Sequence, residues 1–321
     1  MKIVALELMS IGDDVDISKF EQFGEFIRYE FTTKEQIVER AKDADVIIVN
    51  KLPINESTIS ELKNLKLVLI TATGTDNIDI SYCASRGIEV RNAKGYSTTT
   101  VVQHTFAALF YVYEKLRFYD DYVKTGEYAK CPIFCNFDQR FDELADKTWG
   151  IVGLGNIGKG VAAVAKAFGC RVIYYSTSGK NNNSDYERVS LDELLEQSDI
   201  ISIHAPLNDA TRNLFNKDTF KKMKNTAYLV NMGRGPIIND ADLVDALNTN
   251  EIAGAALDVL SKEPILPDNP LMTFKDSNRL LVTPHIAWAS LEARTRLMND
   301  MVKNLESHLA GGDFNLVTPG K

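Results

Sequence analysis

The chain has 321 residues, a length at which two domains are expected. Of these residues 45% are hydrophobic and 25% are charged, which is ordinary for a globular protein. Its net charge of −8 argues against a general binder of nucleic acids or anionic membranes. No apolar run approaches the roughly 18 residues of a membrane helix, and the N-terminal apolar stretch is too short for a signal peptide, so we expect a cytoplasmic protein.

The first hundred residues alternate strand and helix patterns. Such βα alternation predicts a parallel sheet covered by helices. The expected strands cover residues 2–8, 45–50, 65–74 and 88–92, with helical patterns at 33–44, 57–65 and 79–87. A second series of strands begins near Lys147 and covers residues 148–154, 171–176, 199–205, 226–232, 251–259 and 279–284. The fold class is therefore α/β, with two doubly wound parallel-sheet domains.

Two long helical patterns flank the second series, at residues 99–122 and 290–311. Both exceed the usual helix length, and we interpret them as crossings between the domains. The predicted organisation is residues 1–99 as the first part of one domain, 100–288 as an inserted domain, and 289–321 as a helix that returns to the first domain.

A glycine loop follows the first strand of the inserted domain. Gly153, Gly155 and Gly158 form G-x-G-x-x-G between an apolar strand and an Ala/Val-rich helix. The first glycine permits the turn, the second lets a pyrophosphate approach, and the third allows the helix to pack on the strand. Asn156 and Ile157 then offer N–H groups at the helix N-terminus. We expect a dinucleotide site here, with a plain strand–helix turn as the alternative.

The next strand ends without the acid that usually binds the adenosine ribose. Ser176, Thr177 and Lys180 stand there instead. Because a carboxylate would repel the 2′-phosphate of NADP, its absence leaves both NAD and NADP open. The segment can equally be a solvated loop. After the third strand, His204, Ala205 and Pro206 form either an apolar wall beside the adenine or a simple turn, and we do not expect His204 to be catalytic.

Three further strand ends carry polar groups that suit carbonyl chemistry. Arg234 lies between two glycines, Glu263 follows the strand that carries Asp258, and His285 follows a proline. Each can be an ordinary surface or turn residue. Together, at the edge where open α/β sheets bind ligands, they offer a carboxylate anchor, an orienting acid and a proton donor. Glu263, if hydrogen-bonded to His285, would favour the imidazolium form.

The sequence resembles the D-2-hydroxyacid dehydrogenase family over essentially its whole length. The resemblance rests on the segments TATGTDNIDI, NAKGYSTTTVVQHT, VGLGNIG, VNMGRGPIIND, ALDVLSKEP and TPHIAW. Within the family, GYSTTTVVQHTFAALF, PIFCNFDQRFDELADKTWGIVGLGNIGKGVA and HIAWASLEARTRL are most similar to glycerate dehydrogenases, also called hydroxypyruvate reductases.

The resemblance implies a Rossmann-type cofactor domain inserted in a flavodoxin-like substrate domain. It implies that Arg234 anchors the substrate and polarises its carbonyl, that His285 is the acid/base, and that Glu263 is its partner. The backbone of Thr73 and Gly74 would help to bind the substrate carboxylate. We also expect Asp258 to contact the cofactor, NAD or NADP, and a homodimer acting on a small 2-keto acid.

Two other classes of protein are alternatives to this enzyme. Some proteins of the fold are dinucleotide-sensing corepressors, which bind partners instead of turning over substrate. A short-chain dehydrogenase would need Tyr-x-x-x-Lys far downstream of the glycine loop, whereas Tyr111 and Lys115 lie upstream of it. Cys131 and Cys135 are close in sequence, but no second pair or nearby histidine completes a zinc site, so we expect no metal.

Overall fold

The computed structural model describes residues 1–319, and this part of the chain divides into two compact units. Unit 1 contains Met1–Ser97 and the chain from Ala289 onward, and unit 2 contains Thr98–Trp288. The chain thus begins unit 1, builds all of unit 2 and returns to unit 1. The sequence places the divisions after residues 99 and 288. The end of its predicted returning segment, Gly320 and Lys321, lies outside the described residues.

Unit 1 is built on a sheet with the strand order β13-β5-β4-β3-β1-β2. Its strands are β1 (Lys2–Ala5), β2 (Glu25–Arg28), β3 (Val46–Val49), β4 (Leu67–Ile70), β5 (Glu89–Arg91) and β13 (Leu316–Val317). Its helices are α1 (Ile37–Ala41), α2 (Glu56–Ile59), α3 (Ile80–Ser85) and α10 (Leu291–Leu309). The order of β1 to β5 is that of flavodoxin-like folds, which confirms the predicted fold class for this unit.

The sequence analysis does not predict two strands of unit 1, β2 and β13. β2 lies at the sheet edge and has only intermediate or exposed side chains, so it lacks the apolar run that marks its neighbours. β13 has only two residues and pairs antiparallel with β5, whereas the other paired strands of this sheet are parallel. The predicted parallel sheet is therefore extended at this edge by one short antiparallel strand.

The core of unit 1 follows from its central strands. All four residues of β3 and of β4 are buried, as expected for strands covered on both faces. Residues of α1, α2 and α3 join one hydrophobic cluster with these strands. The long α10 contacts β4 and buries Leu297, Met301 and Leu305 at nearly helical spacing.

Unit 2 is built on a sheet with the order β12-β11-β10-β9-β6-β7-β8, all parallel. Its strands are β6 (Thr148–Val152), β7 (Arg171–Tyr175), β8 (Glu187–Arg188), β9 (Ile200–Ile203), β10 (Tyr228–Asn231), β11 (Gly254–Leu257) and β12 (Leu280–Val282). Its helices are α4 (Thr98–Tyr113), α5 (Leu116–Lys124), α6 (Asn156–Ala167), α7 (Leu191–Gln197), α8 (Lys217–Phe220) and α9 (Asp240–Asn248). This is the Rossmann order, extended by one strand at the β12 edge.

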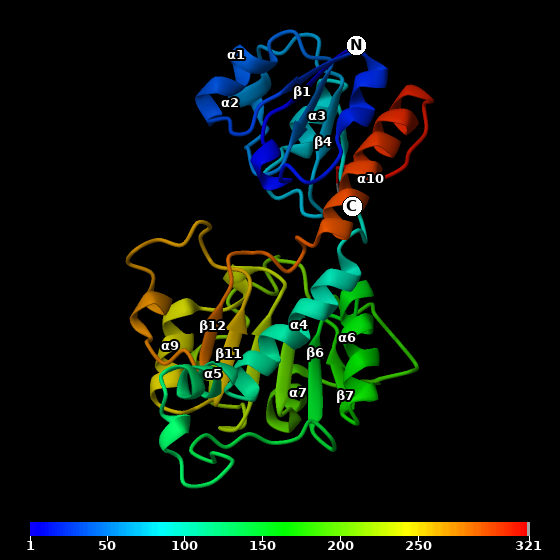
Figure 1. Cartoon of the computed structure of the whole chain (residues 1–321). Helices are drawn as coiled ribbons and strands as arrows, with labels where there is room; N and C mark the ends of the chain where they lie inside the picture. Colours follow the sequence, from blue (N-terminus) through cyan, green and yellow to red (C-terminus); the bar gives the residue numbers. More distant parts are fainter. Residues whose placement is uncertain (320–321) are drawn as a thin grey trace. The chain divides into compact units, whose positions relative to one another are not determined.

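Helices cover both faces of the unit 2 sheet, and α4 runs beside α6 on one of them (Figure 1). Residues of α4 and α6 form one hydrophobic cluster with Trp149 and Ile151. Residues of α7, α8 and α9 form the other. Because all strands of this sheet are parallel, their carboxyl ends lie along one edge of the sheet. This edge carries the candidate site.

The helix expected over residues 99–122 is broken between α4 and α5, which corrects the sequence analysis. Lys115 adopts a left-handed backbone conformation, with φ of 58°, and so ends the α-helical hydrogen bonding. Its buried Nζ donates to the hydroxyl of Tyr228 (2.9 Å) and the carbonyl of Asn278 (3.3 Å). Burial lowers the pKa of this amine. The contacts come from segments more than a hundred residues away, which local periodicity does not reveal.

Candidate active site

The glycine loop joins β6 to α6, and each glycine has a distinct spatial reason. Gly153 has φ of 92°, and a Cβ there would lie 2.9 Å from the backbone of Ala205. A Cβ on Gly158 would lie 2.4 Å from the carbonyl oxygen of Gly153. A Cβ on Gly155 would meet nothing within 4 Å, so this side of the loop is open to an incoming group.

The N-terminus of α6 suits the phosphates of a dinucleotide. Gly155 is the N-cap residue and supplies no side-chain cap, so the first N–H groups of the helix, including those of Asn156 and Ile157, are not capped by a side chain at that position. Backbone donors and the positive end of the helix dipole favour an anion there. The open face of Gly155 and this uncapped turn together fit a pyrophosphate group.

At the end of β7, Ser176 is buried instead of facing solvent. Its Oγ accepts a hydrogen bond from the backbone N–H of Asn181 (3.3 Å), whose side chain donates to the carbonyl of Leu154 in the glycine loop. Thr177 is partly exposed and Lys180 is exposed. The segment that follows β7 is thus folded back on the glycine loop, and the predicted contacts of Ser176, Thr177 and Lys180 with a ribose stay predictions.

Arg188, which the sequence analysis missed, lies beside the same segment. It is exposed, and one of its terminal nitrogens lies 3.9 Å from the position of a Cβ on Gly179. β8 pairs with β7, which brings this cation to the loop. Arg188 stands twelve positions after Ser176, on the far side of a polar loop. A search for motifs near the end of β7 therefore does not include it.

At the end of β9, the side chain of His204 makes no hydrogen bond within residues 1–319. Both ring nitrogens are buried and without a partner there. Burial lowers the pKa of His204 to about 3, so the ring is neutral at physiological pH. Ala205 packs closely on Gly153, and Pro206 is exposed. The predicted cofactor contacts of these three residues stay predictions.

Arg234 follows β10 in a segment held by its neighbours. Asn231 accepts from the N–H of Gly233 (3.0 Å) and donates to the carbonyl of Arg234 (3.0 Å). The Nη1 of Arg234 donates to the carbonyl of Gly233 (2.9 Å). A Cβ on Gly235 would lie 1.9 Å from the carbonyl carbon of Leu260, so only glycine lets this segment pack against the loop after β11.

Glu263 and His285 form a hydrogen-bonded pair. His285 Nδ1 lies 2.7 Å from Glu263 Oε2, and the other carboxylate oxygen accepts the N–H of Leu260 (3.0 Å). The two side chains are 27% and 29% exposed. The pair is therefore fixed through Nδ1 on the protein side, which leaves Nε2 as the ring nitrogen to meet a substrate.

Asp258, at the end of β11, is buried and holds the turn of His285. Its carboxylate accepts the hydroxyl of Thr283 (2.6 Å) and the N–H groups of Ile286 and Ala287 (both 2.8 Å). Its backbone carbonyl accepts the N–H of His285 (2.8 Å). These contacts show that Asp258 shapes the turn. Its predicted contact with a cofactor stays a prediction.

Thr73 and Gly74 belong to unit 1 and follow β4 at its carboxyl end. The carbonyl of Thr73 accepts a hydrogen bond from the Asn92 side chain (2.7 Å), which fixes part of this loop. Their predicted contact with a substrate carboxylate stays a prediction.

Within residues 1–319, no group of three or more His, Cys, Asp or Glu side chains is placed to hold a metal ion. In the same residues, no helix has the length and apolarity to cross a membrane.

Comparison with known proteins decides the family. Residues 106–287 match the family model described as D-isomer specific 2-hydroxyacid dehydrogenase, NAD binding domain. The chain belongs to the D-isomer specific 2-hydroxyacid dehydrogenase family. This confirms the family and the enzyme class predicted from the sequence, and it makes unit 2 the region that matches the NAD-binding domain.

Relatives of this dehydrogenase match it from end to end. It is 38% identical to a hydroxypyruvate reductase of Blautia hydrogenotrophica, over 99% of each chain. It is 36% identical to a glycerate dehydrogenase of Methylorubrum extorquens, over 98% of each chain. Among solved structures, an acyclic imino acid reductase in complex with NADPH and D-Arg has a TM-score of 0.88 and 32% identity, covering 99% of this chain and all of the other.

Proposed function

We propose that this dehydrogenase reduces a small 2-keto acid, hydroxypyruvate or glyoxylate, to the D-2-hydroxy acid, and that it catalyses the reverse oxidation. The observation that carries the proposal is the pair of His285 and Glu263 at 2.7 Å, on the same sheet edge as Arg234 and the glycine loop. Relatives named hydroxypyruvate reductase, glycerate dehydrogenase and glyoxylate reductase support this substrate class.

Each residue of the site has a separate task in the reaction. Nicotinamide dinucleotide, when bound, supplies or accepts the hydride. In the reductive direction, Nε2 of His285 gives a proton to the carbonyl oxygen, while Glu263 holds Nδ1 and so orients the ring. The guanidinium of Arg234 binds the carboxylate and polarises the carbonyl with its fork of N–H groups. Thr73 and Gly74 stay predicted contributors to carboxylate binding.

For the cofactor, we propose that the enzyme uses NADPH as well as NADH. The end of β7 has no acid to repel a 2′-phosphate. The loop that follows it contains the exposed Lys180, and the exposed Arg188 lies beside this loop. The relative solved with NADPH supports this extension. The predicted cytoplasmic location stays a prediction.

We also propose a homodimer formed through unit 2. The apolarity of α4 in the sequence favours a dimer, but the structure buries much of that face inside unit 2, including Phe106, Leu109 and Val112. Several exposed apolar side chains lie instead in the arm of residues 116–141, among them Ile133, Phe134 and Phe137. Phe134 is 88% exposed and Phe137 is 81% exposed there, an arrangement typical of an interaction surface.

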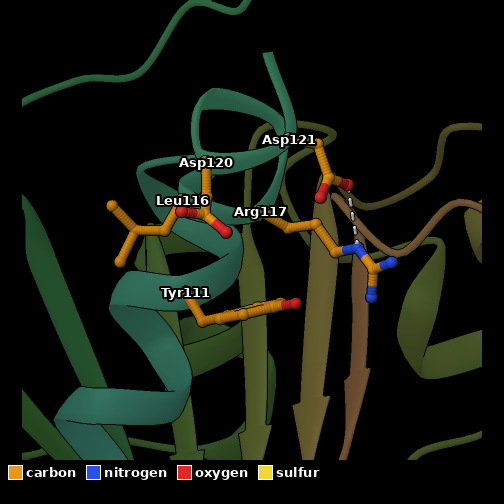
Figure 2. A pocket seen from close by; sticks show the side chains of 5 residues that line it. All are labelled: Tyr111, Leu116, Arg117, Asp120 and Asp121. Atoms are coloured by element: carbon orange, nitrogen blue, oxygen red, sulfur yellow. Dashed lines mark hydrogen bonds and ion pairs between the residues drawn. The ribbon is translucent and has the colours of Figure 1, made fainter. Parts of the chain in front are cut away.

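Figure 2 shows a pocket at the base of this arm, where α4 meets α5. It is lined by Tyr111, Leu116, Arg117, Asp120 and Asp121, and Arg117 Nε lies 3.2 Å from Asp121 Oδ2. The pocket is lined from α4 and α5 and by none of the strand-end residues described above, so we assign it to the arm and not to the reaction. Light scattering at micromolar concentration tests the dimer, and a monomer would refute it.

The experiment that tests the function is a substrate panel. Hydroxypyruvate, glyoxylate, pyruvate, and branched and aromatic 2-keto acids are each assayed with NADH and with NADPH. We expect the highest kcat/KM for hydroxypyruvate or glyoxylate, and measurable rates with both cofactors. Dinucleotide binding without turnover of any keto acid would instead favour the corepressor alternative.

A further inference from the structure

His104 lies on α4 and reaches the turn that carries His285. Its Nε2 is 3.2 Å from the hydroxyl oxygen of Thr283 and 3.6 Å from Oδ1 of Asp258. His104 and Thr283 are 179 positions apart in the chain. Nothing in the sequence motifs or in the reaction scheme above gives His104 a role.

The direction of the hydrogen bonds follows from the donors available. A threonine hydroxyl has one proton and can accept further bonds. At 2.6 Å from Asp258 Oδ1, the Thr283 hydroxyl donates to the carboxylate, which already accepts backbone N–H groups. The Thr283 oxygen therefore accepts from Nε2–H of His104. The result is a directed chain from α4 through Thr283 to Asp258.

This chain ends on the group that shapes the catalytic turn. The backbone carbonyl of Asp258 accepts the N–H of His285, and its carboxylate accepts the next two N–H groups of the turn. His285 has φ of 55°, a left-handed conformation that is unfavourable for a residue with a side chain. Such a conformation persists only where the surroundings hold it. Asp258 supplies that hold.

The Asp258 carboxylate itself needs support. The residue is 1% exposed, and a buried carboxylate is costly unless hydrogen bonds and charges compensate it. Within residues 1–319, the basic side chain found within 4.0 Å of it is His104. Without His104, the carboxylate and the Thr283 hydroxyl would lose the partner that α4 provides, and water or an altered rotamer would replace it.

We infer that His104 is a positioning residue for the reaction. Acting through Thr283 and Asp258, it fixes the turn that holds His285 against Glu263. This inference rests on the proposed function, since proton delivery by His285 is the step that it serves. A loosened turn misdirects Nε2 without removing the carboxylate anchor, so kcat is expected to fall more than KM for the keto acid rises.

The kinetic test compares variants that keep or remove one donor. His104→Leu removes the Nε2 donor, whereas His104→Gln places an amide N–H near the same position. We expect kcat for keto-acid reduction to fall about tenfold in His104→Leu, with His104→Gln within about threefold of the unchanged protein. Thr283→Val should match His104→Leu, and the double variant should lose no more than either alone, because both break the same chain.

The matched control is Gln103→Leu, an exposed position on the same helix, which should leave kcat unchanged. Thermal unfolding of every variant separates a general loss of stability from a specific loss of kcat. If His104→Leu does not fold, Thr283→Val and His104→Gln still test the chain, since each retains a side chain of nearly the native shape.

A spectroscopic readout is independent of turnover. The chain has four histidines, so selective ¹⁵N-histidine labelling gives a simple NMR spectrum, in which His285→Ala identifies the Nδ1–H bonded to Glu263. We expect that resonance to broaden or disappear through exchange in His104→Leu and to persist in Gln103→Leu. An unchanged resonance together with kcat within twofold of the native protein, or equal losses in His104→Leu and His104→Gln, would overturn the inference. If the unmodified protein turns over no keto acid, the proposed function fails, while the resonance still decides the role of His104.

Discussion

The two halves of the strand edge in unit 2 are organised differently. At the ends of β11 and β12, polar side chains bond to one another within the chain: His285 to Glu263, and Asp258 to Thr283. At the ends of β6, β7 and β9, the chain offers glycines, a buried serine and His204, whose ring has no partner within residues 1–319. We name the two halves after their proposed roles: the ends of β11 and β12 form the reaction half, and the ends of β6, β7 and β9 form the cofactor half. Arg234, which follows β10, lies between the two halves.

The comparison of His285 with His204 shows why residue type alone does not define a catalytic group. Both follow a strand of the same sheet, at the same edge. His285 has an acidic partner and is 27% exposed, so it can exchange a proton with a substrate. Burial holds His204 neutral by lowering its pKa to about 3. The partner and the exposure, which depend on other strands, make the difference.

The largest expected effect is on the reaction half. His285→Ala removes the proton donor, and we expect turnover in both directions to fall by at least about 100-fold. Steady-state kinetics checks this, with cofactor binding followed by fluorescence as the control for folding. Turnover close to that of the native protein would remove His285 from the chemistry and erase the proposed difference between the halves.

Arg234→Lys probes the boundary between the halves. Lysine keeps the charge but not the planar fork that binds a carboxylate and polarises a carbonyl together. We expect kcat/KM for reduction to fall by about tenfold or more, with the KM for the cofactor nearly unchanged. Kinetics like those of the native enzyme would show that Arg234 contacts neither substrate group.

Glu263→Gln sharpens the role of the acid. The amide can still bond to Nδ1 of His285, but it lacks the negative charge that holds and polarises the ring during proton transfer. We expect kcat for reduction and for oxidation to fall by about tenfold or more, with the KM for the cofactor nearly unchanged. Steady-state kinetics in both directions checks this. A kcat like that of the native enzyme would break the assignment of the Glu–His pair and leave Arg234 in place.

His204→Leu tests the cofactor half and should affect stability more than chemistry. Since the folded pKa of His204 is about 3 and the unfolded value is about 6.5, the unfolded chain binds a proton that the folded one excludes. Native stability therefore falls as the pH drops from about 6.5 towards 3. His204→Leu has no ring to protonate and therefore avoids this loss of stability, which amounts to about 2 kcal/mol at pH 5.

Urea unfolding at pH 7 and pH 5 checks this difference. We expect the native protein to lose more stability than His204→Leu between the two pH values, while kcat stays within about threefold. If both proteins lost the same stability between pH 7 and pH 5, the pKa of His204 in the folded protein would not be lowered. Its ring would then have a hydrogen-bond partner in solution.

The sequence marks the candidate residues of the site more clearly than it marks their hydrogen-bond partners. Residues Gly153 to Gly158, Arg234, Glu263 and His285 stand at strand ends, where apolar runs and glycines mark them locally. His104 and Thr283 meet across 179 positions, and Lys115 meets Tyr228 across 113. Contacts of this kind leave no periodic pattern, so the break after α4 and the support of the turn that carries His285 appear only in three dimensions. The pairing of β13 with β5 was hidden for the same reason.

The smallest expected effect concerns cofactor choice. Ser176 is 5% exposed and accepts the N–H of Asn181, and an aspartate there can accept the same bond while placing a negative charge beside the ribose. We expect Ser176→Asp to raise KM for NADPH by about fivefold, because a 1 kcal/mol repulsion is a factor of about five, while KM for NADH holds or improves. Arg188→Ala and Lys180→Ala are the matched variants, since each removes one nearby cation and should weaken only NADPH. Equal changes for both cofactors in all three variants would show that the loop supports the fold of the site without reading the 2′-position. The cofactor half would then select its ligand through the backbone of the glycine loop alone.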